Sequence, residues 1–184
     1  QKVRDNIDAA FSEAVERILS ALKQNRKVVV TGVGKNLHIG EKISATLAST
    51  GSRSVILNPT QAMHGDLGIL NDGDVVLALS YSGESEELLQ LMPAIKRRSV
   101  ELITLTGAPE SSLAKLSDSI IRVTIDREAC PFNMAPTAST TATLAVGDAL
   151  AMALIAARGF KKEDYAKLHP GGAIGRALLL RVCD

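Results

Sequence analysis

The chain is poor in aromatic residues and has no tryptophan: Phe, Trp and Tyr together make up 3% of its 184 residues. Proteins that bind single-stranded nucleic acid stack the bases on such side chains, so this composition argues against that class. The net charge is only +1 at pH 7, which gives no overall positive field to recruit nucleic acid or an anionic membrane. We therefore expect neither of these partners.

Cysteine is also scarce, and the two thiols, Cys130 and Cys183, form no CxxC pair. Such usage is typical of a reducing compartment, and no signal peptide is visible at Gln1, so we expect a cytoplasmic protein. The three histidines lack metal-ligand spacing, so we predict no required metal and no other cofactor. The longest apolar stretch, residues 142–157, is shorter than the ~20 residues that span a bilayer and contains Asp148. A buried core or interface helix is the better interpretation.

What the chain does contain is a regular alternation of apolar β-type runs and helical patterns. Residues 5–24 show one apolar stripe at helical spacing, and residues 37–49 are predicted to form the next helix. The strands are continuous apolar runs, as in parallel sheets covered on both faces. They are expected at residues 28–31, 53–57, 74–80, 100–106 and 119–123. We predict one α/β domain over residues 1–184, a doubly wound five-stranded parallel sheet flanked by helices, with the flavodoxin-like order 2-1-3-4-5.

The most informative stretch is residues 80–85, Ser-Tyr-Ser-Gly-Glu-Ser, between the third strand and a helix that is predicted to run to residue 98. Hydroxyls and free backbone N–H groups converge at such a junction, where the helix dipole favours an anion. Three hydroxyls exceed what one N-cap uses. Ser80, Ser82 and Ser85 therefore predict a phosphate seat rather than ordinary capping.

A second glycine turn, Gly32-Val33-Gly34-Lys35, follows the first strand. It is not a P-loop, which requires glycine at the position of Val29, nor a dinucleotide fingerprint, which requires glycine at Leu37. In the predicted strand order this turn lies beside the serine turn, at the switch point where open α/β sheets bind ligands. The backbone at Gly34 and the Lys35 ammonium are therefore expected to line the site of a small anionic ligand.

Together these motifs resemble the SIS (sugar isomerase) domain, most closely the arabinose-5-phosphate isomerases of the KpsF/KdsD-like family. The resemblance covers residues 32–184. Its markers are Gly32-Val33-Gly34-Lys35, His38-Ile39-Gly40, Ala48-Ser49-Thr50-Gly51, His64-Gly65-Asp66-Leu67-Gly68, Ser82-Gly83-Glu84, Glu128-Ala129-Cys130-Pro131, Ala135-Pro136-Thr137, Gly147-Asp148-Ala149-Leu150 and His169-Pro170-Gly171-Gly172. One marker alone would be weak, but this ordered set is highly specific.

The resemblance implies an aldose–ketose isomerase that interconverts D-ribulose 5-phosphate and D-arabinose 5-phosphate, the entry to Kdo for lipopolysaccharide or capsule. It also implies a homotetramer whose sites form between subunits. The positions that match the family's catalytic residues are Lys35, Glu87, Glu128 and His169. Substrate contacts are implied for Gly34, Gly51, Ser52, His64, Ser80, Ser82, Gly83, Glu84 and Ser85.

The isomerisation needs a phosphate anchor, ring opening, a base and stabilisation of an enediolate. Glu128 is predicted to be the base, with a carboxylate poised near neutrality. His169 is predicted to protonate the ring oxygen and, by family analogy, to reach a neighbouring subunit's site. Lys35 would offset phosphate or enediolate charge. Glu87 would act directly or orient Lys35 through an ion pair, and His64 would hold sugar hydroxyls or only its own loop.

The chain departs from the family pattern at three places. Asn36-Leu37 replaces the usual Ser-Gly, and Asn58 replaces a possible zinc-contacting histidine. Many relatives continue into paired CBS domains, which would begin near residues 181–184, so no CBS pair is expected. The early stop and Asn36 suggest the hypothesis that CMP-Kdo, a pathway end product, binds the SIS domain directly as a feedback ligand.

Two other functions stay open. A non-catalytic phosphosugar-binding regulatory module would keep the serine anchor and lose the base and the turn histidine, whereas Glu128 and His169 are both present. An isomerase of another sugar phosphate, such as a hexose phosphate, differs in pocket size, which sequence does not reveal.

Overall fold

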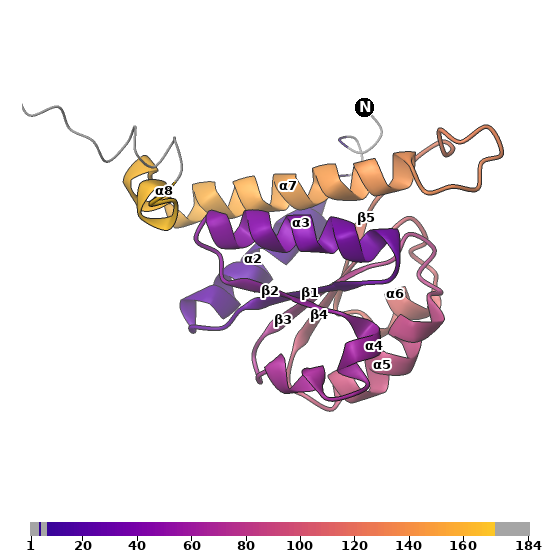
Figure 1. The fold of residues 1–184 in the computed structure, drawn as a ribbon, viewed down its shortest axis with the longest axis horizontal. Helices are drawn as coiled ribbons and strands as arrows, with labels where there is room; N and C mark the ends of the chain where they lie inside the picture. Colours follow the sequence, from indigo (N-terminus) through magenta and orange to yellow (C-terminus); the bar gives the residue numbers. More distant parts are fainter. Residues whose placement is uncertain (1–3, 5–6, 172–184) are drawn as a thin grey trace, which may run out of the picture.

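Five apolar runs form the central sheet: β1 (Val28–Gly32), β2 (Ser54–Leu57), β3 (Val75–Leu79), β4 (Glu101–Thr106) and β5 (Ser119–Arg122). The computed structural model describes residue 4 and residues 7–171. All neighbouring strands are parallel and their order is β2-β1-β3-β4-β5, which confirms the predicted fold class and strand order (Figure 1). Every residue of β1 and β3 is buried, as their unbroken apolar sequences require.

Helices cover both faces of this sheet. One face carries α2 (Ala9–Lys23), α3 (Lys35–Ser49) and α7 (Ala138–Arg158), and the other carries α4 (Pro59–Ala62), α5 (Glu86–Lys96) and α6 (Ser112–Leu116). Each face encloses its own apolar cluster. The segment after β2, for which the sequence patterns predicted neither a helix nor a strand, contains α4 and a 3₁₀ turn, η1 (Asp66–Ile69). Asn58 starts α4 by accepting the Thr60 N–H at 2.9 Å, a local capping signal that the prediction overlooked.

The long helix α7 is longer than its apolar stretch suggested. It has 21 residues and ends at Gly159 in the left-handed conformation, and by length and composition alone it is long enough to cross a membrane. However, Val146, Leu150 and Leu154 are buried in the core of the domain. A Cβ on Gly147 would lie 2.4 Å from Ile43 of α3, so the two helices pack in close contact. We therefore interpret α7 as a core helix.

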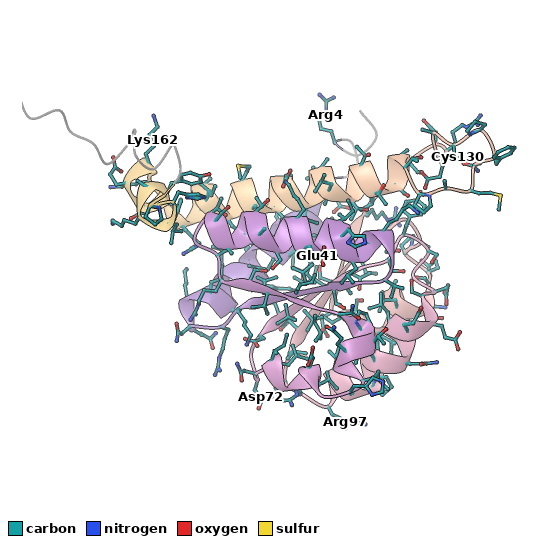
Figure 2. All side chains as sticks on the ribbon, in the orientation of Figure 1. Arg4, Glu41, Asp72, Arg97, Cys130 and Lys162 are labelled. Carbon is teal, nitrogen blue, oxygen red and sulfur yellow. The ribbon has the colours of Figure 1, made fainter. Side chains whose placement is uncertain are left out.

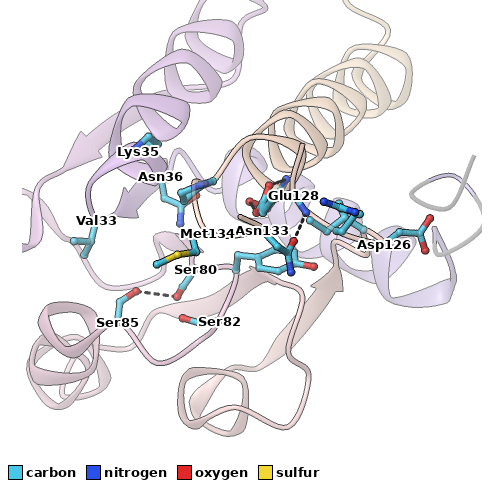
Figure 3. A pocket seen from close by; sticks show the side chains of 15 residues that line it. Val33, Lys35, Asn36, Ser80, Ser82, Ser85, Asp126, Glu128, Asn133 and Met134 are labelled. Carbon is cyan, nitrogen blue, oxygen red and sulfur yellow. Dashed lines mark hydrogen bonds between the residues drawn. The ribbon is translucent and has the colours of Figure 1, made fainter. Parts of the chain in front are cut away.

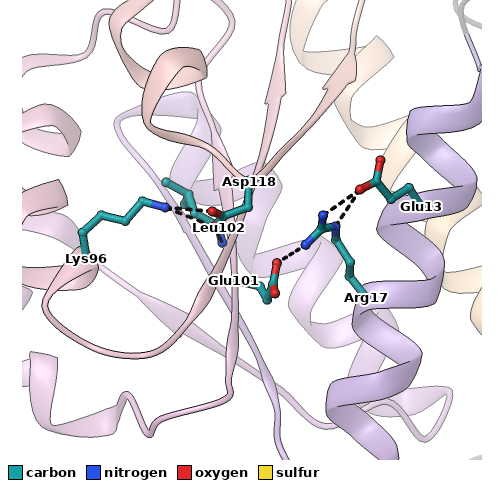
Figure 4. A network of polar contacts seen from close by, with 6 residues as sticks. All are labelled: Glu13, Arg17, Lys96, Glu101, Leu102 and Asp118. Atoms are coloured by element: carbon teal, nitrogen blue, oxygen red, sulfur yellow. Dashed lines mark hydrogen bonds and ion pairs between the residues drawn. The ribbon is translucent and has the colours of Figure 1, made fainter.

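The charged side chains at the amino edge of the sheet pair with one another (Figure 4). Arg17 of α2 bonds Glu13 and Glu101, which fastens α2 to β4. On the far side of β4, the Asp118 carboxylate accepts the Leu102 N–H at 2.7 Å and the Lys96 ammonium at 3.0 Å. These pairs serve the fold, and the chemistry that the sequence predicted belongs to the opposite edge.

The helix α8 (Lys162–Leu168) and the irregular segment 126–136 lie at opposite ends of α7 (Figure 1). Segment 126–136 projects beyond the N-terminal end of α7, where Figure 2 labels Cys130. A helix of 21 residues is about 30 Å long at 1.5 Å per residue. This separation decides which predicted site residues meet within one chain.

Candidate active site

A pocket of about 490 Å³ lies at the carboxyl edge of the sheet, within the ~300–1,000 Å³ typical of small-molecule sites. The turns after β1 and β3 and the segment after β5 form its walls. It brings together five of the predicted site residues: Lys35, Ser80, Ser82, Ser85 and Glu128. In Figure 3, Lys35 and Asn36 lie on the α3 side, the three serines lie below, and Glu128 lies across from Lys35.

The serine turn is tightly built. The buried Ser80 hydroxyl accepts the Gly83 N–H at 3.0 Å and lies 3.0 Å from the Ser85 hydroxyl. Gly83 has φ +67°, and a Cβ there would lie 1.9 Å from the Ser111 hydroxyl, so no other residue fits without a shift. Ser80 and Gly83 thus hold the shape of the turn, and Ser82 and Ser85 are the hydroxyls more open to a ligand.

The start of α5 is suited to an anion. This helix begins at Glu86, directly after the serine turn as predicted, and Ser85 at its N-cap position makes no side-chain capping bond. The N–H groups of the first helical turn have no partner within a helix, and the dipole places partial positive charge there. With the two nearby hydroxyls, this end of α5 has the features of a phosphate seat.

Neither of the two predicted acids near this turn, Glu84 and Glu87, lines the pocket. The Glu84 carboxylate accepts the Ser112 N–H at 2.7 Å, and this backbone hydrogen bond at the start of α6 lowers the pKa of Glu84. Glu87 is exposed in the first turn of α5 and does not line the pocket. Glu87 and Lys35 form no ion pair, so the hypothesis that one orients the other has no support in the described residues.

Glu128 is the most heavily bonded residue of the pocket. Its carboxylate accepts the Thr137 N–H at 2.8 Å, the Thr137 hydroxyl at 3.1 Å, the Ser139 N–H at 3.2 Å and the Ser139 hydroxyl. Thr137 makes no capping bond at the start of α7, and the Glu128 carboxylate takes over that role. The Glu128 N–H in turn donates to the side-chain oxygen of Asn133 at 2.7 Å (Figure 3).

These bonds overturn the expectation that Glu128 is poised near neutrality. Burial disfavours the charged carboxylate and raises its pKa, but hydrogen bonds from the Ser139 hydroxyl and the Thr137 N–H, with two weaker ones, outweigh it. The result is a pKa of about 2. Glu128 is therefore a persistent anion at the wall of the pocket, and a weaker base than the sequence suggested.

Glu128 should stabilise the fold in a pH-dependent way. Its pKa of about 2 lies below the ~4.3 of an unfolded glutamate, so its contribution is complete above about pH 4.5 and is lost as the pH falls through the folded value. We expect Glu128→Gln to lose about 1 kcal/mol of unfolding free energy at pH 7, because its hydrogen bonds to an ionised carboxylate become weaker bonds to a neutral amide, with the difference shrinking toward pH 2. Urea unfolding at several pH values measures this, and a difference independent of pH would contradict it.

Sequence reasoning missed several residues of this pocket. Arg127 precedes Glu128 and shares its wall, and Tyr81 lies within the serine turn. Asn133 has φ +55° and orients the Glu128 backbone. Asn36 also lines the pocket, at the position where the family pattern has serine. Adjacency to Glu128 would have pointed to Arg127, whereas the role of Asn133 depends on a fold of the loop that has no signal in sequence.

Three predicted residues lie at the other end of α7. Gly51 lines a second pocket, of about 360 Å³, together with Arg158 and residues of α8. Ser52 is buried, and its hydroxyl accepts the Arg158 guanidinium at 3.0 Å. His169 ends α8, where its ring stacks on Tyr165 with centroids 3.9 Å apart and its Nδ1 lies 2.8 Å from the Tyr165 carbonyl oxygen. One chain does not bring these residues to Glu128.

The remaining predictions fall on exposed or undescribed positions. His64 is exposed between α4 and η1 and does not line the pocket of Glu128. Gly34 has φ +58° at the start of α3, which places its backbone beside Lys35. Gly172, Cys183 and the chain end at residues 181–184 lie outside the described residues. Among residues 4 and 7–171, no three His, Cys, Asp or Glu side chains form a group that could hold a metal ion.

Similar curated proteins are isomerases. Arabinose 5-phosphate isomerase KdsD of Salmonella typhi is 53% identical over 178 residues, which are 97% of this chain and 53% of that protein. The Pseudomonas aeruginosa protein of the same name is 50% identical over 185 residues, covering 98% of this chain and 57% of that one. The chain thus spans about half the length of the curated relatives it matches.

Solved structures with the same fold align with this chain over almost the full length of both proteins. A Bacteroides fragilis protein superposes with a TM-score of 0.86 at 36% identity, over 90% of this chain and 88% of that chain. An Escherichia coli CFT073 protein, solved in complex with arabinose 5-phosphate, gives a TM-score of 0.83 at 39% identity, over 91% of this chain and 89% of that chain. The SIS domain family matches residues 21–153. With this match, these relatives and the order of its sheet, the chain belongs to the SIS (sugar isomerase) domain family.

Proposed function

We propose that the chain carries the catalytic unit of an arabinose-5-phosphate isomerase, which interconverts D-ribulose 5-phosphate and D-arabinose 5-phosphate. The observation that carries this proposal is one pocket that holds a phosphate seat, a lysine and an ionised glutamate. The names of the curated relatives and the arabinose 5-phosphate bound to the E. coli structure support the choice of substrate.

The proposed reaction moves one proton along the open-chain sugar. The phosphate binds at the start of α5, with Ser82 and Ser85, and Lys35 offsets its charge. The Glu128 carboxylate takes the C2 proton of the aldose, and the C–H electron pair forms the C1–C2 double bond while the C1 oxygen becomes an oxyanion. That oxygen takes up a proton, the C2 hydroxyl loses one, and Glu128 returns its proton to C1 to give the ketose.

The position of His169, one of the residues that match the family's catalytic residues, favours an active site formed between two subunits. His169, Gly51 and Ser52 lie together at the far end of α7, about 30 Å from the pocket. We propose that a homo-oligomer, a tetramer by the family resemblance, brings this end of a second copy to the Glu128 pocket. The histidine then donates the proton that opens the sugar ring.

A non-catalytic phosphosugar-binding module is the second candidate. The specific observation in its favour is Glu128, whose four hydrogen bonds at the start of α7 are those of a structural acid. An isomerisation assay separates the two functions. The purified chain is incubated with ribulose 5-phosphate and, separately, with other pentose and hexose phosphates, and the products are resolved by chromatography.

Conversion of ribulose 5-phosphate to arabinose 5-phosphate at the highest kcat/KM of the panel is the expected result. Binding without turnover of any member would favour the sensing module. Faster turnover of a hexose phosphate would identify a different isomerase.

Three finer points belong to this proposal. The product would supply Kdo for lipopolysaccharide or capsule, and the protein would act in the cytoplasm. CMP-Kdo would bind the SIS domain directly, near Asn36, which lines the pocket where the family pattern has serine. Titration calorimetry with CMP-Kdo tests this last point, and an absence of binding would remove it.

A further inference from the structure

The pocket contains two basic side chains, and the topology separates them. Lys35 starts α3 directly after β1, the strand that pairs with β3 and so lies next to the serine turn. Arg127 lies in the segment after β5, which is separated from β3 by β4. Lys35 therefore belongs to the phosphate end of the pocket, and Arg127 belongs to the end where Glu128 lies.

The Arg127 guanidinium has no partner among the described residues. Some arginines of the domain are paired: Arg17 bonds Glu13 and Glu101, and Arg158 donates to Ser52. Other exposed arginines, such as Arg122, have no side-chain partner either in the part of the chain that the structure describes, but Arg122 lies outside the pocket, whereas Arg127 lines it. Glu128 follows Arg127 in sequence, but its carboxylate accepts hydrogen bonds from Thr137 and Ser139 and does not pair with Arg127. An exposed cation thus lines the pocket beside a persistent anion without being neutralised by it.

The proposed reaction needs a cation at that end. A carboxylate held as a stable anion is a weak base and lowers the barrier to removing a proton from carbon only slightly. The barrier must therefore be lowered mainly by groups that stabilise the oxyanion formed at the same time. Fixed donors aimed at developing charge are an effective means of doing so. Asn133 accepts the Glu128 N–H with its side-chain oxygen, and its neutral amide would stabilise a developing negative charge less than a cation would. Arginine presents several donors in a planar fork, which suits the two adjacent oxygens of an enediolate.

We propose that Arg127 is a further catalytic residue, whose guanidinium binds the enediolate oxygens at C1 and C2 while Lys35 and the serine turn hold the phosphate. This inference rests on the proposed isomerase function. The guanidinium keeps its charge and its protons throughout. When Glu128 takes the C2 proton, the C–H pair forms the C1–C2 double bond and the carbonyl π pair moves onto the oxygen that Arg127 contacts. When the proton is delivered to C1, the double-bond pair forms the new C–H bond and the C2 oxygen pair forms the ketone.

The test compares Arg127→Ala and Arg127→Lys with the wild-type protein. For Arg127→Ala we expect kcat for ribulose 5-phosphate to fall about 10²–10³-fold, the usual loss for one oxyanion donor, with KM changed by less than about threefold. Lysine keeps the positive charge but lacks the planar set of donors, so kcat of Arg127→Lys should be about tenfold higher than that of Arg127→Ala. Arg122→Ala is the matched control, because Arg122 is exposed at the end of β5 outside the pocket and its replacement removes the same charge.

A second readout uses binding alone. The probe is a phosphorylated four-carbon hydroxamate, whose two adjacent oxygens imitate the enediolate, and calorimetry measures its affinity. Because a transition-state mimic reports interactions that strengthen during reaction, Arg127→Ala should bind it at least about 30-fold more weakly while binding inorganic phosphate as the wild type does.

The outcomes separate this inference from the function on which it rests. A wild-type protein without isomerase activity would refute the proposed function. An active wild type whose Arg127→Ala variant keeps kcat and hydroxamate affinity would overturn only the role of Arg127. An increase in KM and a matching loss of phosphate affinity, with kcat unchanged, would also overturn it, because Arg127 would then be a phosphate ligand.

Discussion

Glu128→Gln is expected to lower kcat by about 10²–10³-fold, the lower part of the range for loss of a general base because this carboxylate is a weak base, with the affinity for phosphosugar nearly unchanged. The amide has the same shape and still accepts from the Ser139 hydroxyl and the Thr137 N–H, so the loop keeps its place. It has no free charge to take up the C2 proton. Steady-state kinetics with ribulose 5-phosphate, and calorimetry with the same sugar, measure the two quantities.

A matched control for this substitution is Glu110→Gln. Glu110 is an exposed acid that does not line the pocket, so its loss changes net charge by the same amount and should leave kcat within about twofold. If Glu128→Gln retains more than about a tenth of wild-type kcat, a general base is not being lost. Glu128 would then serve only to start α7, and the base must be sought elsewhere in the pocket.

The low pKa of Glu128 shows where sequence reasoning succeeds and where it stops. The strand order and the meeting of the Lys35 turn with the serine turn follow from apolar runs and from the rule for open α/β sheets, and the structure confirms both. The state of Glu128 does not follow, because its hydrogen-bond donors come from Thr137 and Ser139, nine and eleven residues further along the chain. No local pattern states that the loop folds back to present them.

The glutamates around the serine turn carry a similar lesson. A sequence motif places Glu84 and Glu87 next to the phosphate seat, but packing decides where their side chains lie. Gly83 fits against Ser111, which brings the start of α6 close enough for Glu84 to accept the Ser112 N–H. The carboxylate is thus used to cap a helix outside the pocket. The sequence motif predicted the phosphate seat before α5 correctly, but it did not predict which nearby side chains line the pocket.

The separation of Glu128 from His169 is the largest departure from a site contained in one chain, and it has a direct test. Glu128 precedes α7 and His169 follows α8 beyond its other end, so a chain of this fold has the two groups about 30 Å apart. If both are catalytic, they must come from different copies. Glu128→Gln and His169→Ala should then each be nearly inactive, the second by about 10²-fold or more, as expected for loss of a general acid.

Co-expression of the two inactive variants should restore activity. In randomly mixed symmetric oligomers, about a quarter of the shared sites receive a wild-type Glu128 from one copy and a wild-type His169 from another, so about 25% of wild-type activity is expected. Size-exclusion chromatography and two different affinity tags show that hybrids form, and co-expressed wild-type chains carrying the same tags are the control. Hybrids that form but stay inactive would show that His169 acts within its own chain or not at all. Recovery would mean that this SIS domain builds each active site only as it assembles, since neither end of α7 holds a complete set of catalytic groups.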